Sequence, residues 1–446
     1  MTARVNVLPF ARLVAGVSAA LLLVAGAWAR PWAARAEGRV VAIGDVHGSA
    51  EGRVVAIGDV HGSAEERVVA IGDVHGSDDG FVAILRAAGL IGQDGHWSGG
   101  SATLVQTGDV TDRGAGVKRA LDLIRALTAE AAKAGGRVVP VLGNHEVMNL
   151  IGELRDVTPA ICASFATANA EAVREEAWAD YTALVAKRGR QRRGESPQAL
   201  TRTREGFLQA YQRGCIEYRL AFSAQGDYGR YLRALPIAVK VQGTVFMHAG
   251  ASPLAPHATL DQLNAQARDE VKRVDRFLER LVRADLAEPW FRLEDIVAVA
   301  AAEVRWTTAR IADGKARGEA PDLTDVDITL VREAAEILGI DRWSLLAGDG
   351  PLWYRGYATA DEATLEAPFT ALLNFWKAER LVVGHTPAPP FQVRARLQGR
   401  VFVIDTGMLA SVYKGTGSAL DIDAGRVTAL YADGTRTPLV PLPVAP

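Results

Sequence analysis

The sequence predicts an α/β fold in which parallel strands alternate with helices. Short apolar runs of strand length alternate with stretches whose apolar residues recur at helical spacing, and this alternation is typical of parallel sheets covered by helices. Several of the apolar runs end in a loop that combines glycine with Asp, Asn or His. Functional groups gather beyond the carboxyl ends of strands in such folds, so these loops are also the candidate functional site.

The composition is that of a globular protein without a strong charge bias. The 446 residues suffice for one large domain or two to three ordinary ones, and 49% of them are hydrophobic. The formal net charge is −2, so we expect no nucleic-acid partner, whose phosphates would need many basic side chains. The basic run at residues 187–193 has no interleaved aromatic side chains for base stacking, and we interpret it as a solvated loop.

Residues 1–36 are predicted to be a signal peptide or an anchor. The first twelve residues contain two arginines, and an uncharged, mostly apolar run follows over residues 13–29. Two small-x-small cleavage sites lie at the end of this run and just after it. This layout predicts a periplasmic or secreted protein. An uncleaved membrane anchor stays open, because the 17 apolar residues lie at the lower limit for spanning a bilayer. Only in that case would the protein contact a membrane.

The chain has two cysteines, Cys162 and Cys215. In an oxidising compartment they could form one disulfide. Two buried free thiols remain the alternative, because the sequence does not show whether the two residues meet.

A tandem repeat with a period of 14 residues follows the N-terminal segment. Its three copies share RVVAIGDVHGS and begin at Arg39, Arg53 and Arg67. We assign residues 37–66, with copies one and two, to a repeat segment and residues 67–446 to the main domain. Copy three is expected to build the site, because an earlier copy would force another GDVHG strand into the next crossover. Copies one and two are then a linker or extra strands, and an array that sequesters metal is the alternative.

The main domain begins with alternating elements. After copy three we expect a helix over residues 78–88, a strand at 102–106, a helix at 117–131 and a strand at 138–142. Later strands are expected at residues 238–247, 381–383, 401–404 and 427–431.

Two long helical stretches, at about residues 153–233 and 260–348, interrupt the strands. They sit between loops that carry polar residues. We interpret them as insertions that form a cap rather than as independent domains, because the motifs on either side belong to one site.

Six polar loops carry the residues with chemistry. They are GDVHG at 72–76, GDVTDRG at 108–114, GNHE at 143–146, HAG at 248–250, GHT at 384–386 and DTG at 405–407. Asp, Asn and His supply oxygen and imidazole donors that suit borderline ions such as zinc, iron and manganese. A single histidine is more often structural, but four of the eight histidines fall in these loops, which favours a metal site.

The order of these loops resembles the phosphoprotein phosphatase branch of the calcineurin-like metallophosphoesterases. The runs GNHEVMNLIGELRDVT at 143–158, GPLWYRGY at 350–357 and IDTGM at 404–408 more narrowly resemble the Shewanella-like protein phosphatases of bacteria and plants. The resemblance extends from Arg67 to about Tyr431. It implies a sandwich of β-sheets flanked by helices, with helical cap insertions, and a binuclear metal-dependent phosphoric monoester hydrolase.

The resemblance also implies a metal ligand in five of the loops. The implied ligands of two divalent or trivalent ions are Asp73 and His75 for the first ion, Asn144, His248 and His385 for the second, and Asp109 as the bridge. The metals would be drawn from manganese, iron and zinc. A hydroxide that bridges the two ions would attack phosphorus.

Four further residues are implied to act on the phosphate ester. His145 would protonate the departing oxygen, and Asp112 would orient and charge its imidazole, with a loop-capping role for Asp112 as the alternative. Arg113 suits the phosphoryl oxygens, because a guanidinium group offers a planar fork of donors. Arg355 is the second phosphate clamp, with a surface salt bridge as the alternative. Glu146 is expected to support the fold rather than to catalyse.

The chain departs from the serine/threonine phosphatase pattern in two places. DTG at 405–407 and Tyr413 stand where a segment with an active-site tyrosine is usual, and one loop has HAG in place of HGG. Both departures agree with the Shewanella-like group, whose plant members resemble tyrosine phosphatases in preference. The expected substrate is therefore a phosphorylated protein, with phosphotyrosine favoured, or a small phosphate ester.

Two other functions stay open. A dinucleotide polyphosphate hydrolase would share GDxHG and GDxxDRG, although large insertions and export count against a cytosolic nucleotide. A non-catalytic metal- or phosphate-binding module is the second alternative. The complete set of loop residues argues against that module.

Overall fold

The computed structural model describes residues 66–191 and 201–440. The predicted signal peptide or anchor at 1–36 and the first two repeat copies lie outside the described residues. Copy three is described, and it forms the first strand, β1 (Val68–Ile71).

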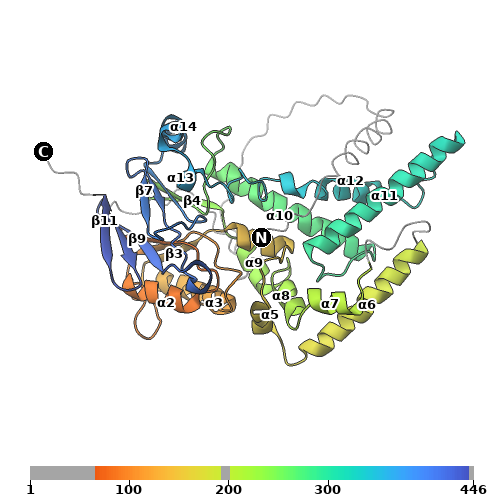
Figure 1. The fold of residues 1–446 in the computed structure, drawn as a ribbon, viewed down its shortest axis with the longest axis horizontal. Helices are drawn as coiled ribbons and strands as arrows, with labels where there is room; N and C mark the ends of the chain where they lie inside the picture. The colour runs from red at the N-terminus through yellow and green to blue at the C-terminus, as the bar shows by residue number, and fades with distance from the viewer. Residues whose placement is uncertain (1–65, 192–200, 441–446) are drawn as a thin grey trace, which may run out of the picture.

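Two mixed β-sheets form the centre of the fold (Figure 1). The first has the order β11-β10-β9-β1-β2-β3, with β2 (Thr103–Gln106), β3 (Arg137–Pro140), β9 (Ser418–Asp423), β10 (Arg426–Tyr431) and β11 (Arg436–Val440). The second has the order β4-β5-β6-β8-β7, with β4 (Ala238–Val241), β5 (Thr244–Met247), β6 (Arg380–Val383), β7 (Arg394–Arg396) and β8 (Val401–Val403). The predicted parallel pairing is confirmed for β1 with β2 and β2 with β3, and β5, β6 and β8 are also parallel.

Each central strand is buried on both faces, as the continuous apolar runs predict. In β1, Val68 and Ala70 face the apolar layer between the two sheets, whereas Val69 and Ile71 face the outer helices. The helices α2 (Asp78–Ala87) and α3 (Val117–Lys133) cover the first sheet, and α13 (Gly356–Thr359) and α14 (Glu362–Trp376) cover the second (Figure 1). The expected α/β sandwich flanked by helices is confirmed.

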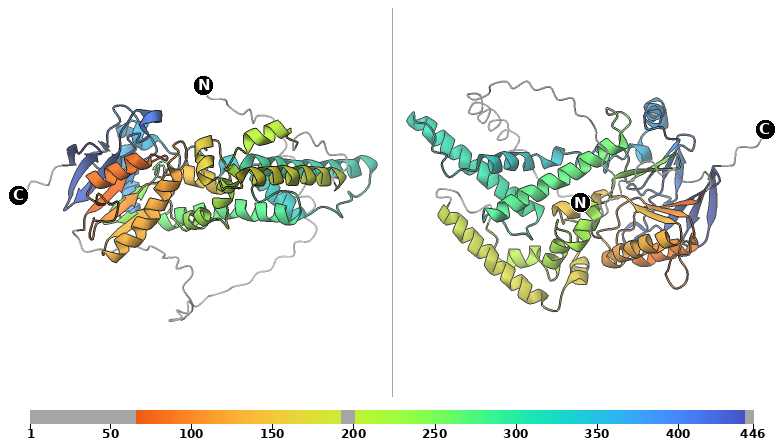
Figure 2. Two further views of the ribbon diagram at one scale, coloured as in Figure 1. Left: turned by 90° about the horizontal axis from the view of Figure 1, so that it is seen from below. Right: turned by 180° about the vertical axis from the view of Figure 1, so that it is seen from behind.

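The two predicted helical stretches lie together at one end of the sheets, on the right in Figure 1 and again to one side in both views of Figure 2. The first contains α5 (Pro159–Phe165), α6 (Ala170–Gln191), α7 (Arg204–Ala210), α8 (Cys215–Ala221) and α9 (Asp227–Arg233). The second contains α10 (Leu260–Arg283), α11 (Leu293–Arg317) and α12 (Ile328–Ile337). Apolar side chains from both stretches join the same core as the outer faces of the sheets.

The two cysteines form a disulfide within the first helical stretch. Cys162 lies in α5 and Cys215 is the first residue of α8. The bond therefore joins two short helices, and the two cysteines are 53 residues apart in the chain. The sequence left a disulfide and two free thiols as alternatives, and the structure contains the disulfide.

One predicted strand was wrong. Residues 238–247 form two antiparallel strands, β4 and β5, rather than one. Gln242 and Gly243 between them both have positive φ, 46° and 74°, and two successive residues in this conformation make the tight turn that suits a hairpin. The apolar run conceals the turn because only one of its two central residues is a glycine.

Three strands, β7, β9 and β11, were not predicted. β9 contains Asp421 and Asp423, and aspartate is depleted in strands. Its position comes from tertiary pairing, since it lies antiparallel to β1 and Asp421 accepts two hydrogen bonds from Arg67 at 2.8 and 3.0 Å.

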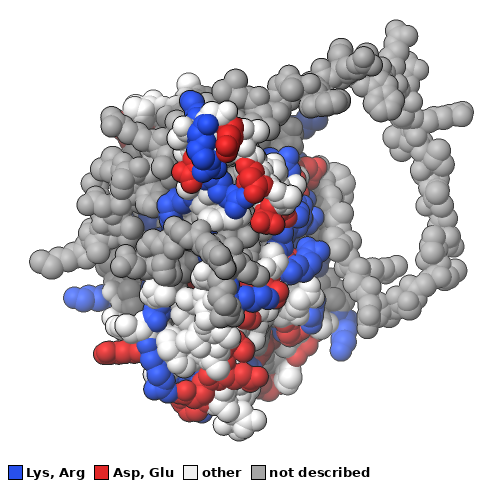
Figure 3. All heavy atoms as spheres, turned by 90° about the vertical axis from the view of Figure 1, so that its right-hand side faces the viewer, with Lys and Arg blue, Asp and Glu red and all other residues white. Residues whose placement is uncertain are grey.

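The face at the helical end of the molecule carries both signs of charge. Figure 3 shows Lys and Arg interspersed with Asp and Glu on this face. Among the residues that the structure describes, no helix combines the length and the apolar character needed to cross a membrane.

Removal of residues 38–65 should leave the site functional. Copy three forms β1, which pairs with β2 and β9, and Glu66, whose carbonyl group accepts a hydrogen bond from Gln242, is retained. We expect hydrolysis of p-nitrophenyl phosphate to stay within about twofold, because the shortened chain keeps β1 and the loop with Asp73 and His75. Asp73→Ala in the full chain should be inactive, although Asp45 and Asp59 remain. Residual activity of that variant would show that the copies replace one another.

Candidate metal centre

The six polar loops meet at the carboxyl ends of the strands. The residues that follow each strand are Asp73 and His75 after β1, Asp109, Asp112 and Arg113 after β2, Asn144 and His145 after β3, His248 after β5, His385 after β6, and Asp405 after β8. Both sheets therefore contribute to one site, as expected for parallel strands whose carboxyl ends share an edge. Five of these residues have a left-handed backbone, with φ between 46° and 70°: His75, Asp109, Asp112, Arg113 and His385. Strain of this kind clusters at functional sites, where the surrounding structure holds it.

One group of donors converges on Nε2 of His248. This atom lies 2.8 Å from Oδ1 of Asn144, 3.0 Å from Nδ1 of His385 and 3.3 Å from Oδ2 of Asp109. Nδ1 of His248 donates to the carbonyl oxygen of Thr107 at 3.0 Å, which leaves Nε2 of the neutral ring with a lone pair. Four atoms that can each donate an electron pair and that face one another in a buried place suit a cation between them.

A second group shares the same aspartate. Oδ2 of Asp109 lies 3.6 Å from Nε2 of His75 and 3.8 Å from Nε2 of His145, and Oδ2 of Asp73 lies 3.8 Å from Nε2 of His75. Nδ1 of His75 donates to the carbonyl oxygen of Thr111 at 3.0 Å, so Nε2 again points to the group. Asp109 thus belongs to both groups, as a bridging ligand must.

The electrostatics of the buried residues fit a bound cation. Burial lowers the pKa of His75 to about 3, and burial together with His248 lowers that of His385 to about 2, so both rings are neutral and each has one nitrogen that can donate a lone pair. Burial opposes a charge on His248, but Asp109 and Asp73 outweigh it and raise its pKa to about 9. The carboxylates therefore attract positive charge, and imidazole with carboxylate donors suits zinc, iron or manganese.

Asp405 lies in one of the six polar loops, but the sequence predicted no role for it. It is buried, and its side chain lies against Asp73. Burial and Asp405 raise the pKa of Asp73 well above its ordinary value. A third carboxylate thus faces the two that were predicted, and metal ions would relieve the repulsion among them.

His145 and Asp112 form a buried pair beside the donors. Nδ1 of His145 donates to Oδ2 of Asp112 at 2.6 Å, so Nε2 is the nitrogen directed toward the shared Asp109. Burial lowers the pKa of His145, but Asp109 and the hydrogen bond to Asp112 outweigh it and the pKa is raised. The arrangement favours a ring that carries a proton to hand on.

Two arginines border the site on its open side. Nη1 of Arg113 lies 2.5 Å from Nε2 of His75, and its Nη2 lies 3.1 Å from Nε2 of His145. Nη1 of Arg355 donates to the carbonyl oxygen of His385 at 2.9 Å. Both guanidinium groups line the same cavity, where they suit an anion with several oxygens.

Glu146 holds two of the loops together. Its carboxylate accepts hydrogen bonds from the backbone N–H groups of Asp109 at 2.7 Å and Gly143 at 2.8 Å, and from two further N–H groups of the β2 loop. The close approach also requires Gly108, with a φ of 91°, where a Cβ atom would lie 2.4 Å from the nitrogen of Gly143. The expected supporting role of Glu146 agrees with these contacts.

A cavity of about 300 Å³ opens over both donor groups. Besides the predicted residues it is lined by Arg155, Asp156, Trp353, Pro387 and Tyr413. The ring of Tyr413 lies under the guanidinium group of Arg113 at 5.3 Å, and Trp353 packs edge-on against His385 with ring centroids 5.9 Å apart. The walls are therefore cationic and aromatic.

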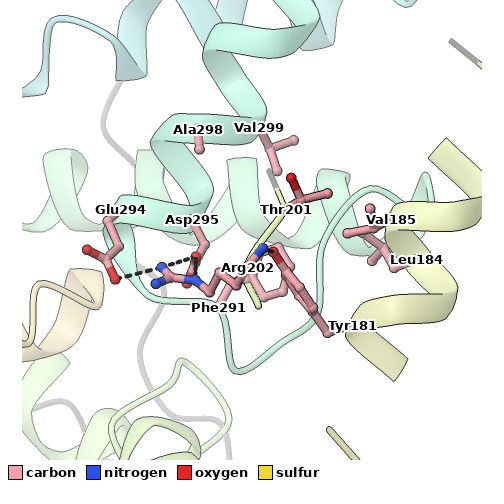
Figure 4. Close-up of a pocket in the computed structure, with 10 residues that line it drawn as sticks. All are labelled: Tyr181, Leu184, Val185, Thr201, Arg202, Phe291, Glu294, Asp295, Ala298 and Val299. Atoms are coloured by element: carbon pink, nitrogen blue, oxygen red, sulfur yellow. Dashed lines mark hydrogen bonds and ion pairs between the residues drawn. The ribbon is translucent and has the colours of Figure 1, made fainter. Parts of the chain in front are cut away.

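A second cavity, of about 260 Å³, lies between α6 and α11 (Figure 4), and none of the metal-centre residues lines it. Its cationic residue, Arg202, is already neutralised by Glu294 at 2.8 Å and Asp295 at 2.6 Å, as the dashed lines in Figure 4 show. Its other walls are mostly apolar. This cavity therefore lacks the unpaired positive charge that would bind the phosphate group of an ester.

The structure brings all ten predicted site residues into one place, and it adds residues that the sequence did not single out. Asn149 and Tyr218 lie behind Asp112, and Trp353 lines the cavity together with Tyr413, which the sequence pointed to only as a departure from the serine/threonine phosphatase pattern. Asn149 follows His145 by four residues in α4 (Asn144–Ile151), and this helical spacing was a usable signal. No sequence signal pointed to Tyr218, because it lies in α8, 69 positions after Asn149 in the chain.

The fold and the donor groups define a metal-dependent phosphoesterase. A sequence model of the calcineurin-like phosphoesterases matches residues 38–307, which is more than half of the chain. The chain belongs to the calcineurin-like phosphoesterase family.

The chain is also similar to individual proteins. An uncharacterised protein of Schizosaccharomyces pombe is 28% identical over 345 residues, 76% of this chain and 72% of the yeast protein. Shewanella-like protein phosphatase 2 of Arabidopsis thaliana is 31% identical over 220 residues, 46% of this chain and 52% of the plant protein. The match thus spans about half of the plant phosphatase. A cold-active protein tyrosine phosphatase of a psychrophilic Shewanella has 23% identity and a TM-score of 0.48, over 84% of this chain and 81% of that one.

Asp109→Asn should lower bound metal and abolish turnover. The variant keeps the shape of the side chain but removes the one negative charge that both donor groups share, so both ions should bind more weakly. Metal content by elemental analysis and turnover of p-nitrophenyl phosphate check this. Asp227→Asn, which changes an aspartate on the exposed side of α9, is the matched control. Full metal content in Asp109→Asn would contradict the bridging role.

Proposed function

We propose that the protein hydrolyses phosphate monoesters at a two-metal site, with phosphotyrosine in proteins as the favoured substrate. The observation that carries the proposal is the arrangement of two donor groups around one shared aspartate, Asp109, below a cavity lined by arginines. When bound, two metal ions would supply Lewis acidity that activates water and draws charge from the phosphoryl group. Manganese, iron and zinc are the metals that these donors suit.

The residues of the chain supply the remaining steps. The first ion would be held by Asp73, His75 and Asp109, and the second by Asn144, His248 and His385 together with Asp109. Arg113 and Arg355 orient the phosphoryl oxygens, because both guanidinium groups face the cavity. As the bond from phosphorus to the departing oxygen breaks, His145 donates its Nε2 proton to that oxygen. Asp112 keeps the opposite nitrogen of the ring engaged at 2.6 Å.

The walls of the cavity support an aromatic leaving group. Trp353 and Tyr413 line the cavity that holds His145, and aromatic pairs gain roughly 0.5–1.5 kcal/mol beyond their burial. A phosphotyrosine ring could lie between them with its phosphate on Arg113. The name of the plant relative, a protein phosphatase, agrees with a phosphoprotein.

The size of the cavity counts against a dinucleotide polyphosphate. About 300 Å³ is at the lower end of the range for small-molecule sites. One phosphate ester with its adjoining ring suits this space better than two nucleosides do. A dinucleotide polyphosphate therefore remains the second candidate substrate.

A substrate comparison tests the proposal. With manganese, iron or zinc supplied separately, we expect kcat/KM for phosphotyrosine peptides and p-nitrophenyl phosphate to exceed that for diadenosine tetraphosphate by at least roughly tenfold, the effect of 1.4 kcal/mol of transition-state binding. Trp353→Ala should reduce the preference for phosphotyrosine over phosphoserine peptides. A higher kcat/KM for the dinucleotide would reverse the order of the two candidates.

We also propose that the protein is exported. The basic start, the apolar run and the small-x-small sites of residues 1–36 support a cleaved signal peptide, and the disulfide between Cys162 and Cys215 suits an oxidising compartment. N-terminal sequencing of the mature protein should then begin near Arg30 or Glu37. A full-length chain in the cytoplasm would contradict export.

A further inference from the structure

A chain of buried hydrogen bonds runs from the proposed proton donor into the first helical stretch. Oδ2 of Asp112 accepts from His145 at 2.6 Å, and Oδ1 of Asp112 accepts from Nδ2 of Asn149 at 2.9 Å. Oδ1 of Asn149 in turn accepts from the hydroxyl group of Tyr218 at 2.6 Å. All four side chains are buried.

We infer that Asn149 and Tyr218 are positioning residues for leaving-group protonation, because they fix Asp112 and through it the imidazole of His145. The inference rests on the proposed role of His145 as the proton donor. Neither residue lies in a metal-binding loop, and neither touches the cavity that would hold the substrate.

The orientation of the Asn149 amide decides whether Asp112 is held. In the observed orientation Nδ2 donates both to Asp112 and to the carbonyl oxygen of His145 at 2.8 Å. The reversed amide would place its oxygen against the carboxylate, and two acceptors cannot bond. The two acceptors, Asp112 and the His145 carbonyl group, thus select the observed orientation, and the hydroxyl group of Tyr218 holds the amide there because it donates to Oδ1.

Tyr218 itself is held by the helical stretch rather than by the sheets. It lies three residues after Cys215, whose disulfide joins α8 to α5. Its ring packs against Phe165 and Phe222, with centroids 4.9 and 4.5 Å apart. Burial raises the pKa of Tyr218 well above its ordinary value, so the hydroxyl group stays a donor. The insertion therefore supports the pair of Asp112 and His145 from behind through the hydroxyl group of Tyr218.

Other groups near the pair do not replace this support. Oδ2 of Asp156 lies 4.0 Å from Nδ1 of His145, which is too long for a hydrogen bond. The hydroxyl group of Thr111 donates to Glu146 at 2.9 Å. Both oxygens of Asp112 are engaged only when Asn149 keeps its orientation.

The test uses Tyr218→Phe, which removes a single oxygen atom. Tyr228→Phe is the matched control, because the Tyr228 hydroxyl group also donates to an aspartate at 2.6 Å, but to Asp122 of α3, away from the site. His145→Asn is the reference for loss of the proton donor. For each variant, kcat and KM are measured with phenyl phosphate, a poor leaving group, and with p-nitrophenyl phosphate, a good one, together with bound metal.

We expect Tyr218→Phe to lower kcat for phenyl phosphate by roughly 3- to 10-fold, the effect of one hydrogen bond, and for p-nitrophenyl phosphate by less than about twofold. KM and metal content should not change. His145→Asn should show the same pattern with a loss of roughly 10²-fold or more for phenyl phosphate. Tyr228→Phe should leave the ratio of the two substrates unchanged.

Equal losses for both substrates in Tyr218→Phe, or no loss, would overturn the inference. If His145→Asn itself shows no dependence on the leaving group, the proposed proton donor is wrong, and this outcome is distinct from the first. Should Tyr218→Phe fail to fold, Asn149→Ser carries the same expectation, because its hydroxyl group cannot bridge Asp112 and Tyr218.

Discussion

The structure depends on one buried carboxylate that is shared by two sets of ligands. Asp109 follows a strand of the first sheet, yet its Oδ2 lies 3.3 Å from His248 of the second sheet. The contact therefore requires the two sheets to end at the same edge. It also explains why the neighbouring loops are strained, since Asp109 has a φ of 57° and His385 a φ of 68°. Residues keep such a conformation only where packing holds them.

The apolar layers supply that rigidity. Each central strand is covered on one face by the opposite sheet and on the other by helices, so the strand ends cannot shift without loss of packing. Glu146 then ties the loops of β2 and β3 through four backbone N–H groups. Burial of a negative charge destabilises the folded protein unless the charge is paired. The donor groups of this site suit metal ions as the paired positive charges.

The helical insertions do more than enclose the sandwich. The disulfide between Cys162 and Cys215 joins two of their helices, and one of these helices brings Tyr218 to Asn149 behind the hydrogen-bonded pair of Asp112 and His145. A segment that interrupts the sheets in sequence thus becomes part of the support for the site. Local motifs alone would not reveal this link, because the residues involved are 69 positions apart.

The sequence by itself determined the α/β alternation, the parallel pairing of β1 to β3 and the set of loop residues, because each depends on local spacing and on polar residues that directly follow a strand. It missed the turn at Gln242, because only one of the two central residues is a glycine, and it missed the strand at Asp421, because the position of that strand depends on tertiary pairing with β1. Only the tertiary structure decided that Cys162 meets Cys215, that Asp405 faces Asp73 and that Tyr218 reaches Asn149. These contacts join segments far apart in the chain, and no periodicity encodes which distant surfaces will pack together.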